Sequence, residues 1–360
     1  MAAGLARCEK ERSLLGFFTR DIGMDLGTAS VLVYIKGKGI VLREPSVVAV
    51  DEYSHTILAV GEKALTMLGR TPKGISAIRP LKNGVISDYE LTERMIHYYL
   101  RLVMGRFNFA RPRVVVCVPA GVTEVERRSV VEATADAGSM DTKLIEEPVA
   151  AAIGAGLPVT KAGGCMVVDI GGGTTDLAVI SMSSAVVKES VTIAGDKVDE
   201  AIIKHMRRNH NLLIGERTAE RIKMQLAVVA PEPPMGAMDV TGRSVLSGLP
   251  RTAHIEAAEI SQAVEEVATA IIETIHSVLE RTPPELASDI YQNGITLTGG
   301  GALLGGLCRR VQTELRIPCT LAENPADCVV RGTGMALENM ELYGDLVHDY
   351  RKPVRYDFRR

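Results

Sequence analysis

The chain has neither an excess of charge of one sign nor a long hydrophobic run. Its 41 lysine and arginine residues are balanced by 44 aspartate and glutamate residues, giving a net charge of −3, so we expect no nucleic-acid partner. No apolar run reaches the roughly 18–20 residues needed to cross a bilayer. Residues 1–18 also lack the continuous apolar core of a secretion signal. These absences predict a cytoplasmic protein.

The familiar motifs for metals and nucleotides are missing as well. The six cysteines form no Cys-x-x-Cys pair, which argues against a zinc site or a disulfide framework and favours a reducing compartment. The segment GRTPKGIS, beginning at Gly69, lacks the Lys-Ser/Thr ending of a Walker A loop. No G-x-G-x-x-G run follows a strand-like segment, so the dinucleotide-binding fingerprint is absent too.

What the sequence does contain is a repeated strand–glycine turn–strand pattern. It occurs as DIGMDLGTASVLVYI from Asp21 and again as VVDIGGGTTDLAV from Val167. Strand-like runs alternate with helical segments in both halves of the chain, which is typical of α/β layers. Asp25 and Asp169 occupy equivalent places before the two turns. We therefore predict an internal duplication of one α/β unit, with a cleft between the copies.

Three further segments have recognisable local signals. Thr123 and Glu126 have the spacing of a capping box and predict the start of a helix. Apolar residues recur in steps of three and four through residues 255–282, which predicts an amphipathic helix. Residues 230–252 are rich in proline and then alternate in polarity, and we expect an inserted subdomain with a hairpin turn near Gly242.

The glycine turns at residues 27–30 and 171–174 suggest phosphate binding. Glycine lets backbone N–H groups approach a ligand where a Cβ would collide, and a run of such donors cradles phosphate oxygens. Asp25 and Asp169 would then lie beside the phosphates, where repulsion calls for Mg²⁺ held through water. A third turn, at residues 299–301, precedes a predicted helix and could contact a nucleoside or a phosphate.

Two acidic segments are candidates for catalysis or for nucleotide contact. Glu146 and Glu147 lie between a predicted strand and a helix that begins near Pro148, and only one of the two can face a cleft. A helix-capping role for Glu147 is the alternative. Glu220 and Lys223 stand one helical turn apart, and on their own they are most simply a solvated ion pair.

Several ordered motifs together resemble the MreB/Mbl family of bacterial actins, and within it the Mbl branch. They are DIGMDLGTAS, VVDIGGGTTDLAVIS, LIEEPVAAAIGAGLPV, ERIK and LTGGGALLGGL, and the resemblance runs over residues 20–340. It implies an α/β, actin-like fold of duplicated ribonuclease-H-like domains around a nucleotide cleft. It also implies a weak ATPase that forms membrane-associated filaments and directs cell-wall synthesis through membrane proteins, so that rod shape is maintained.

The resemblance also assigns site residues and the cofactors ATP and Mg²⁺. Glu147 matches the family's hydrolytic glutamate, and Thr174 matches the threonine that positions water. The implied nucleotide contacts are Thr28, Ala29, Ser30, Gly172, Gly173, Thr174, Glu220, Arg221, Ile222, Lys223, Gly300, Gly301, Ala302 and Leu303. Ser30 departs from the family, which usually has asparagine there.

The family pattern further implies four subdomains between two terminal segments. Subdomain IA would contain residues 20–50, 81–161 and 332–350, and subdomain IB residues 51–80. Subdomain IIA would contain residues 162–197 and 261–331, and subdomain IIB residues 198–260. Residues 1–19 would form an extension and residues 351–360 a tail.

Two segments could bind a membrane surface. In residues 103–113, Met104, Phe107 and Phe109 cluster among arginines in a predicted loop, although the chain has only five phenylalanines. The alternative is that both phenylalanines pack in the core. Residues 1–19 could form an amphipathic helix on an anionic membrane or a disordered tail. Alternatively, the start of the chain is misassigned and these residues are not part of the protein.

Two other classes of protein share the predicted phosphate turns. An Hsp70-like chaperone would need a substrate-binding β domain and a helical lid after the ATPase, which we do not expect in the residues up to Arg360. A sugar or acetate kinase would need an acceptor site and a base for a hydroxyl group, and no segment clearly provides them. The filament protein is therefore our first hypothesis.

Overall fold

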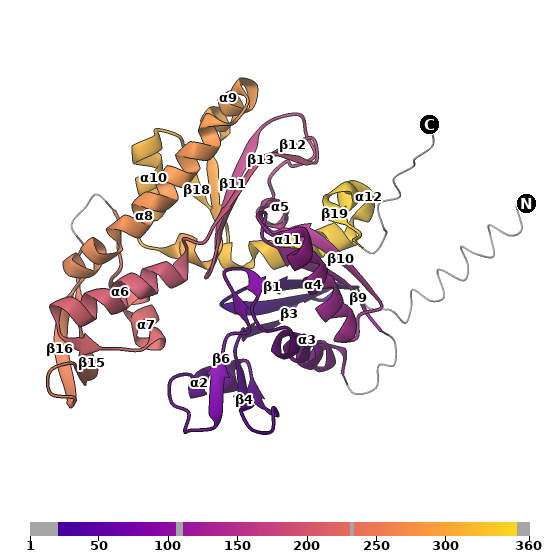
Figure 1. Cartoon of the computed structure of the whole chain (residues 1–360). Helices are drawn as coiled ribbons and strands as arrows, with labels where there is room; N and C mark the ends of the chain where they lie inside the picture. The colour runs from indigo at the N-terminus through magenta and orange to yellow at the C-terminus, as the bar shows by residue number, and fades with distance from the viewer. Residues whose placement is uncertain (1–20, 106–110, 231–233, 351–360) are drawn as a thin grey trace, which may run out of the picture. The chain divides into compact units, whose positions relative to one another are not determined.

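The structure is a computed structural model that describes residues 21–105, 111–230 and 234–350 (Figure 1). Within it the chain divides into two compact units. Unit 1 comprises Met1–Val118, Val122–Glu146 and Val330–Arg360, and unit 2 comprises Pro119–Gly121 and Glu147–Val329. The predicted terminal extension, the tail, Phe107 and Phe109 lie outside the described residues. The finer division into four subdomains stays a prediction.

Unit 1 is built on a sheet with the strand order β19-β10-β9-β1-β2-β3. The strands are β1 (Asp21–Leu26), β2 (Ser30–Ile35), β3 (Gly39–Pro45), β9 (Arg113–Val118), β10 (Asp141–Glu146) and β19 (Val347–His348). The first three strands are antiparallel neighbours, whereas β9 runs parallel to both β1 and β10. Parallel central strands are covered on both faces, which explains why β9 reads as a continuous apolar run.

Helices and a small sheet complete unit 1. Helix α3 (Tyr89–Met104) packs against α4 (Glu124–Asp136), whose capping box between Thr123 and Glu126 is confirmed. A three-stranded sheet is formed by β4 (Val48–Asp51), β5 (Ile57–Val60) and β6 (Ile75–Ile78), with α2 (Glu62–Met67) against it. The hairpin of β7 (Leu81–Lys82) and β8 (Val85–Ile86) leads into α3.

Unit 2 repeats the sheet of unit 1. Its order is β13-β12-β11-β17-β18, from β11 (Cys165–Ile170), β12 (Thr175–Ser181), β13 (Ser184–Val191), β17 (Ile295–Thr298) and β18 (Cys319–Leu321). As in unit 1, two antiparallel pairs are followed by parallel ones. Strands β11, β12, β13, β17 and β18 correspond to β1, β2, β3, β9 and β10. The predicted duplication of an α/β unit is confirmed by this shared topology.

Helices surround the unit 2 sheet and extend beyond it (Figure 1). Helix α5 (Glu147–Gly154) packs on β11 and β12, and α6 (Gly195–Asn209) packs against both α7 (Glu216–Leu226) and α8 (Ala257–Glu280). The amphipathic helix predicted from residues 255–282 is therefore present as α8. Further α-helices of the described residues are α9 (Pro284–Asn293) and α10 (Leu307–Leu315) in unit 2. Helix α11 (Cys328–Glu338) leads from unit 2 into unit 1, where α12 (Met340–Tyr343) follows.

The predicted hairpin is present, but its turn lies a few residues beyond Gly242. Gly242 lies inside β15 (Ala237–Ser244), which pairs with β14 (Leu212–Leu213) and β16 (Pro250–Glu256), and the turn falls at residues 245–249. A Cβ on Gly242 would come within 2.5 Å of the Leu213 carbonyl oxygen. Glycine is needed there because a neighbouring strand approaches closely.

Each unit has its own hydrophobic core. The core of unit 1 lies around the buried strands β1, β2 and β9 and the inner face of α3. The core of unit 2 lies between its sheet and α6, α7, α8 and α10. Among the helices in the described ranges, none is long and apolar enough to cross a membrane.

Candidate functional site

The two predicted phosphate turns have the same geometry. In unit 1 the N–H of Gly27 donates to the carbonyl oxygen of Ser30 at 3.1 Å, and in unit 2 the N–H of Gly171 donates to that of Thr174 at 2.8 Å. The aspartates hold matching register positions, since Asp25 pairs with Leu32 and Asp169 with Asp176. The duplication therefore reaches individual backbone hydrogen bonds.

The triple glycine at residues 171–173 is not explained by left-handed backbone. None of the three glycines has the positive φ that favours glycine. At Gly171, a Cβ would lie 3.2 Å from the carbonyl oxygen of Thr174. Glycine therefore suits position 171 because the backbone of the turn approaches it closely. Open backbone along such a turn is what phosphate oxygens require.

The third glycine turn packs against the end of β11. Gly299 has φ +83°, and a Cβ there would lie 2.3 Å from the carbonyl oxygen of Ile170. A Cβ on Gly301 would lie 2.4 Å from Cγ2 of Ile170. Ile170 directly precedes the turn at residues 171–174, so two of the predicted nucleotide segments are neighbours within unit 2. Gly300 has open space around its Cβ position.

The residues after this third turn form a short 3-10 helix, η1 (Gly300–Leu303), rather than the start of an α-helix. Helix α10 begins at Leu307, so the predicted order of strand, glycine turn and helix is present, with η1 between Gly299 and α10. The side chain of Ala302 is buried, whereas that of Leu303 is exposed to solvent.

A segment that the sequence reasoning missed also contacts the triple-glycine turn. The N–H of Asp196 donates to the carbonyl oxygen of Gly172 at 2.8 Å, and the N–H of Gly195 donates to that of Gly171 at 3.2 Å. These two donors belong to the first turn of α6. The start of α6 therefore holds the backbone of the turn in place.

Lys223 connects α7 to the same region. Its Nζ donates to Oδ2 of Asp199 in α6 at 2.9 Å and to the carbonyl oxygen of Gly195 at 3.4 Å. Lys223 therefore pairs with Asp199, not with Glu220 as the spacing in the sequence suggested. Burial raises the pKa of Asp199 to about 6, although the ammonium group of Lys223 acts to lower it.

Helix α7 exposes only part of the predicted contact set. Glu220 and Arg221 are exposed, whereas the side chain of Ile222 is fully buried in the core of unit 2. An aliphatic side chain that the core uses in this way cannot also cover a ligand. Ile222 therefore packs α7, and the exposed contacts of this segment are its polar members.

In unit 1 the first turn is tied down by neighbouring segments. Thr28 Oγ1 accepts a hydrogen bond from the N–H of Gly84 at 2.9 Å, and Arg79 Nη1 donates to the carbonyl oxygen of Ala29 at 3.3 Å. Ser46 Oγ donates to the carbonyl oxygen of Gly27 at 2.6 Å. Two of these bonds use carbonyl oxygens of the turn and one uses the Thr28 hydroxyl, and together they hold the shape of the turn.

The predicted magnesium carboxylates suit a cation. Burial raises the pKa of Asp25 to about 7, so its ionised form needs a compensating charge that a divalent cation would supply. Asp169 is buried, and its Oδ1 accepts a hydrogen bond from Thr298 Oγ1 at 2.7 Å. A carboxylate oriented in this way can hold the water shell of Mg²⁺.

The adjacent glutamates differ in their surroundings. Glu146 ends β10 and forms an ion pair with Arg127 at 3.3 Å, within unit 1. Glu147 begins α5 in unit 2 and is also buried. The ion pair gives Glu146 a structural role in unit 1, and Glu147 stays the catalytic candidate that the family resemblance implies.

The predicted membrane cluster is only partly described. Met104 is the last residue of α3, not a loop residue, and it is buried in the core of unit 1, so its assignment as a membrane contact is corrected. Phe107 and Phe109 lie outside the described residues. Any membrane contact of this segment would therefore depend on these two phenylalanines.

Solved structures of the same architecture define the class of protein. MreB5 of Spiroplasma citri bound to AMPPNP has a TM-score of 0.84 and 35% identity, and covers 90% of this chain and 97% of that one. MreB5 of Spiroplasma citri bound to ADP has a TM-score of 0.84 and 36% identity, and the match covers 90% of this chain and 98% of that one. A MamK double-helical filament, at 23% identity and a TM-score of 0.75, shows the fold alone. The predicted actin-like fold is confirmed.

Sequence comparison narrows the class to one family. The model of the MreB/Mbl protein family matches residues 19–344, and the chain belongs to this family. Cell shape-determining protein Mbl of Bacillus subtilis (strain 168) is 50% identical over 90% of this chain and 97% of its own length. Cell shape-determining protein MreB of Escherichia coli (strain K12) is 50% identical over 91% of this chain and 96% of its own length. The chain is thus an actin-like protein of a family whose relatives determine cell shape.

Proposed function

We propose that the protein binds ATP and polymerises into filaments that direct cell-wall synthesis and maintain rod shape. The observation that carries this proposal is the matching backbone hydrogen bond in the glycine turns before Ser30 and Thr174, one in each repeat of an actin-like fold. Duplicated turns of this kind supply backbone donors for two sides of a polyphosphate. Similarity to MreB5 structures containing AMPPNP and ADP supports a nucleotide as the ligand.

Nucleotide contacts would come from both units. In unit 1 we assign phosphate contact to Thr28, Ala29 and Ser30, with Asp25 toward Mg²⁺. In unit 2 we assign phosphate contact to Gly172, Gly173 and Thr174, with Asp169 toward Mg²⁺. Ribose and base contacts are assigned to the exposed part of α7 and to η1; the residues are Glu220, Arg221, Lys223, Gly300, Gly301, Ala302 and Leu303.

Hydrolysis would be slow and coupled to assembly. We assign Glu147 to orienting the attacking water and Thr174 to positioning it, because both are buried polar residues of unit 2. A bound nucleotide can favour assembly by no more than the difference between its affinities for the assembled and the free chain. The lifetime of a filament would then follow the nucleotide that its subunits hold.

We further propose that the filament is cytoplasmic and lies on the anionic inner face of the plasma membrane, with cell-wall synthesis membrane proteins as partners. Phe107 and Phe109, in a segment with several arginines, suit such a surface by chemistry. A chaperone or a sugar kinase is the competing assignment, and neither has a supporting observation in the described residues.

The test is sedimentation of the purified protein with anionic liposomes in ATP, in ADP and without nucleotide. A Phe107→Ser/Phe109→Ser variant is compared with a Tyr53→Ser/Leu58→Ser control, in which two exposed apolar residues of unit 1 are removed elsewhere. We expect ATP-dependent pelleting that the phenylalanine variant weakens and the control does not. Monomeric protein in every condition, with ATP still bound, would contradict the filament assignment.

A further inference from the structure

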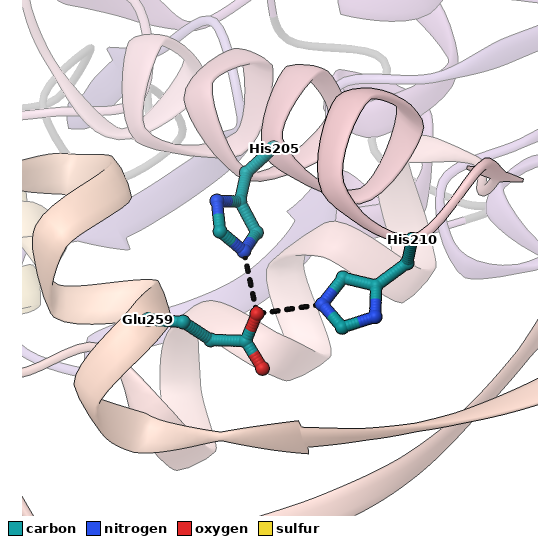
Figure 2. Close-up of side chains that lie close together, drawn as sticks. All are labelled: His205, His210 and Glu259. Atoms are coloured by element: carbon teal, nitrogen blue, oxygen red, sulfur yellow. Dashed lines mark hydrogen bonds and ion pairs between the residues drawn. The ribbon is translucent and has the colours of Figure 1, made fainter.

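His205, His210 and Glu259 form a side-chain cluster in unit 2 away from the phosphate turns (Figure 2). His205 Nε2 lies 2.8 Å from Glu259 Oε2, and His210 Nε2 lies 2.6 Å from the same oxygen. Both rings thus direct their Nε2 atoms at one carboxylate oxygen, as Figure 2 shows. Two imidazoles and a carboxylate are the donor set of known three-ligand zinc sites.

We propose that these three side chains bind a divalent transition-metal ion of the Zn²⁺ type. The candidate ligand atoms all lie within 4.8 Å of one another. In a tetrahedral site with bonds of about 2.0–2.1 Å, donor atoms stand roughly 3.3 Å apart. The two nitrogen–oxygen distances therefore have to widen by only about 0.5–0.7 Å to admit the ion, and a fourth position stays available for water.

Secondary structure holds the ligands in place from separate elements. His205 lies in the last turns of α6, and His210 is its C-terminal capping residue, with its carbonyl oxygen accepting a bond from Arg251 Nη1 at 3.2 Å. Glu259 belongs to the capping box of α8, where its Oε1 accepts the N–H of Glu256 at 2.9 Å. That bond fixes Oε1 and turns Oε2 toward the histidines.

The surroundings also suit a metal ligand. The amide nitrogen of Asn209 lies 3.4 Å from Nδ1 of His205. With a metal on Nε2, Nδ1 carries the proton, and rotation of the exposed amide would present its oxygen as acceptor. His205 also lines a cavity of about 440 Å³ between α6 and α8, so this ligand of the cluster borders an open space.

Oxygen-preferring ions are disfavoured, because two of the three donors are imidazole nitrogens. The bound ion would join the end of α6 to the start of α8. It would therefore stabilise the folded state, because an ion that binds only the native protein shifts unfolding by mass action.

The experiment is a titration of the metal-free full chain with Zn²⁺, and with Co²⁺ as a spectroscopic probe, in excess Mg²⁺ so that oxygen sites are filled. Variants His205→Gln, His210→Gln and Glu259→Gln remove one ligand each, and Gln at 259 keeps a capping oxygen. His254→Gln is the matched control, since His254 is exposed and its ring bonds Asp239 in its own hairpin. Circular dichroism and melting without metal check that every variant is folded.

A second control distinguishes Zn²⁺ binding by the histidine cluster from Zn²⁺ binding by cysteine thiolates. Cys308 Sγ lies 3.4 Å from Cys319 Sγ and could also take Zn²⁺, so a Cys308→Ser/Cys319→Ser variant is included. We expect one Zn²⁺ per chain, visible bands of four-coordinate Co²⁺, and affinity reduced about 100-fold or more by each ligand variant. We also expect Zn²⁺ to raise the melting temperature of wild type and of the His254 variant, but not of His205→Gln.

Zn²⁺ binding that survives in all three ligand variants would overturn the proposal. Loss of binding in the cysteine variant alone would overturn it too, because the ion would then belong to the thiol pair. Absence of any binding in excess Mg²⁺ would mean that the cluster is only a hydrogen-bonded contact between α6 and α8. None of these results depends on ATP binding or polymerisation, so the two proposals fail separately.

Discussion

Lys223 Nζ in α7 lies 2.9 Å from Oδ2 of Asp199 in α6, and the two side chains are only 20% and 14% exposed. The same ammonium group reaches the carbonyl oxygen of Gly195, whose own N–H bonds the triple-glycine turn. Asp199 Oδ1 has no hydrogen-bond partner within the described residues. One ion pair therefore links the proposed nucleotide helix to the phosphate turn, and it does so partly shielded from water.

Removing one partner of this pair is expected to destabilise the protein. Lys223→Met leaves a buried carboxylate without its cation, and we expect a loss of about 1–3 kcal/mol in the free energy of unfolding. The double variant Lys223→Met/Asp199→Asn should lose less than the sum of the two single variants, because the charges interact. Urea unfolding of the four proteins measures this. Strictly additive losses would show that the pair contributes nothing.

The pH dependence of stability tests the same carboxylate. The pKa of Asp199 is about 6 in the folded chain, above its ordinary value of 3.8, so between those pH values the folded state binds more protons than the unfolded one. Its contribution to stability is then present below about pH 4 and is lost as pH rises through 6. We expect the stability difference between wild type and Asp199→Asn to change across this window in that direction. A difference that is constant from pH 4 to 7 would contradict the shift.

Glu147 is expected to act in hydrolysis and not in binding. Glu147→Ala should bind ATP as wild type does and release phosphate about 100-fold more slowly, since water would lose its orienting base. Phosphate release and fluorescent-nucleotide binding are measured side by side. Glu147→Asp should keep part of the activity. Equal phosphate release by wild type and Glu147→Ala would remove Glu147 from this role.

Alanine substitutions at Gly299 and Gly300 in the third turn are expected to have different effects on stability. Gly299→Ala introduces a Cβ 2.3 Å from the carbonyl oxygen of Ile170 at a φ of +83°, and should cost at least about 2 kcal/mol. Gly300→Ala places its methyl group in open space and should change stability by less than about 0.5 kcal/mol. Thermal unfolding distinguishes them. Similar melting temperatures for the two variants would refute the proposed packing against β11.

Local signals in the sequence were sufficient for much of the fold. The capping box of Thr123 and Glu126, the apolar stripe of α8 and the repeat around Asp25 and Asp169 all depend on neighbouring residues, and each is present as predicted. Gly242 shows the limit. Its role in β15 follows from the approach of β14, a contact that the local sequence does not contain, whereas Gly248, with φ +72°, marks the true turn.

The segments of the candidate site that could be predicted are its glycine turns. The turns at residues 27–30 and 171–174 could be found by self-similarity, but Asp199 and the start of α6 gave no motif. Lys223 pairs with Asp199 of another helix because the packing of α6 on α7 decides which carboxylate lies nearest to its ammonium group. His205 and Glu259 are likewise far apart in sequence and meet only through the packing of α6 on α8.

The most direct test of the account is the stoichiometry and affinity of ATP binding in Mg²⁺, measured by calorimetry for three aspartate variants. Ser30→Asp and Gly172→Asp each add a negative charge to one turn, and Ser184→Asp adds the same charge on an exposed edge strand as a control. We predict one ATP per chain, at least tenfold weaker binding in either turn variant, and no change in the control. Normal affinity in either Ser30→Asp or Gly172→Asp would contradict the claim that both repeats hold the same nucleotide.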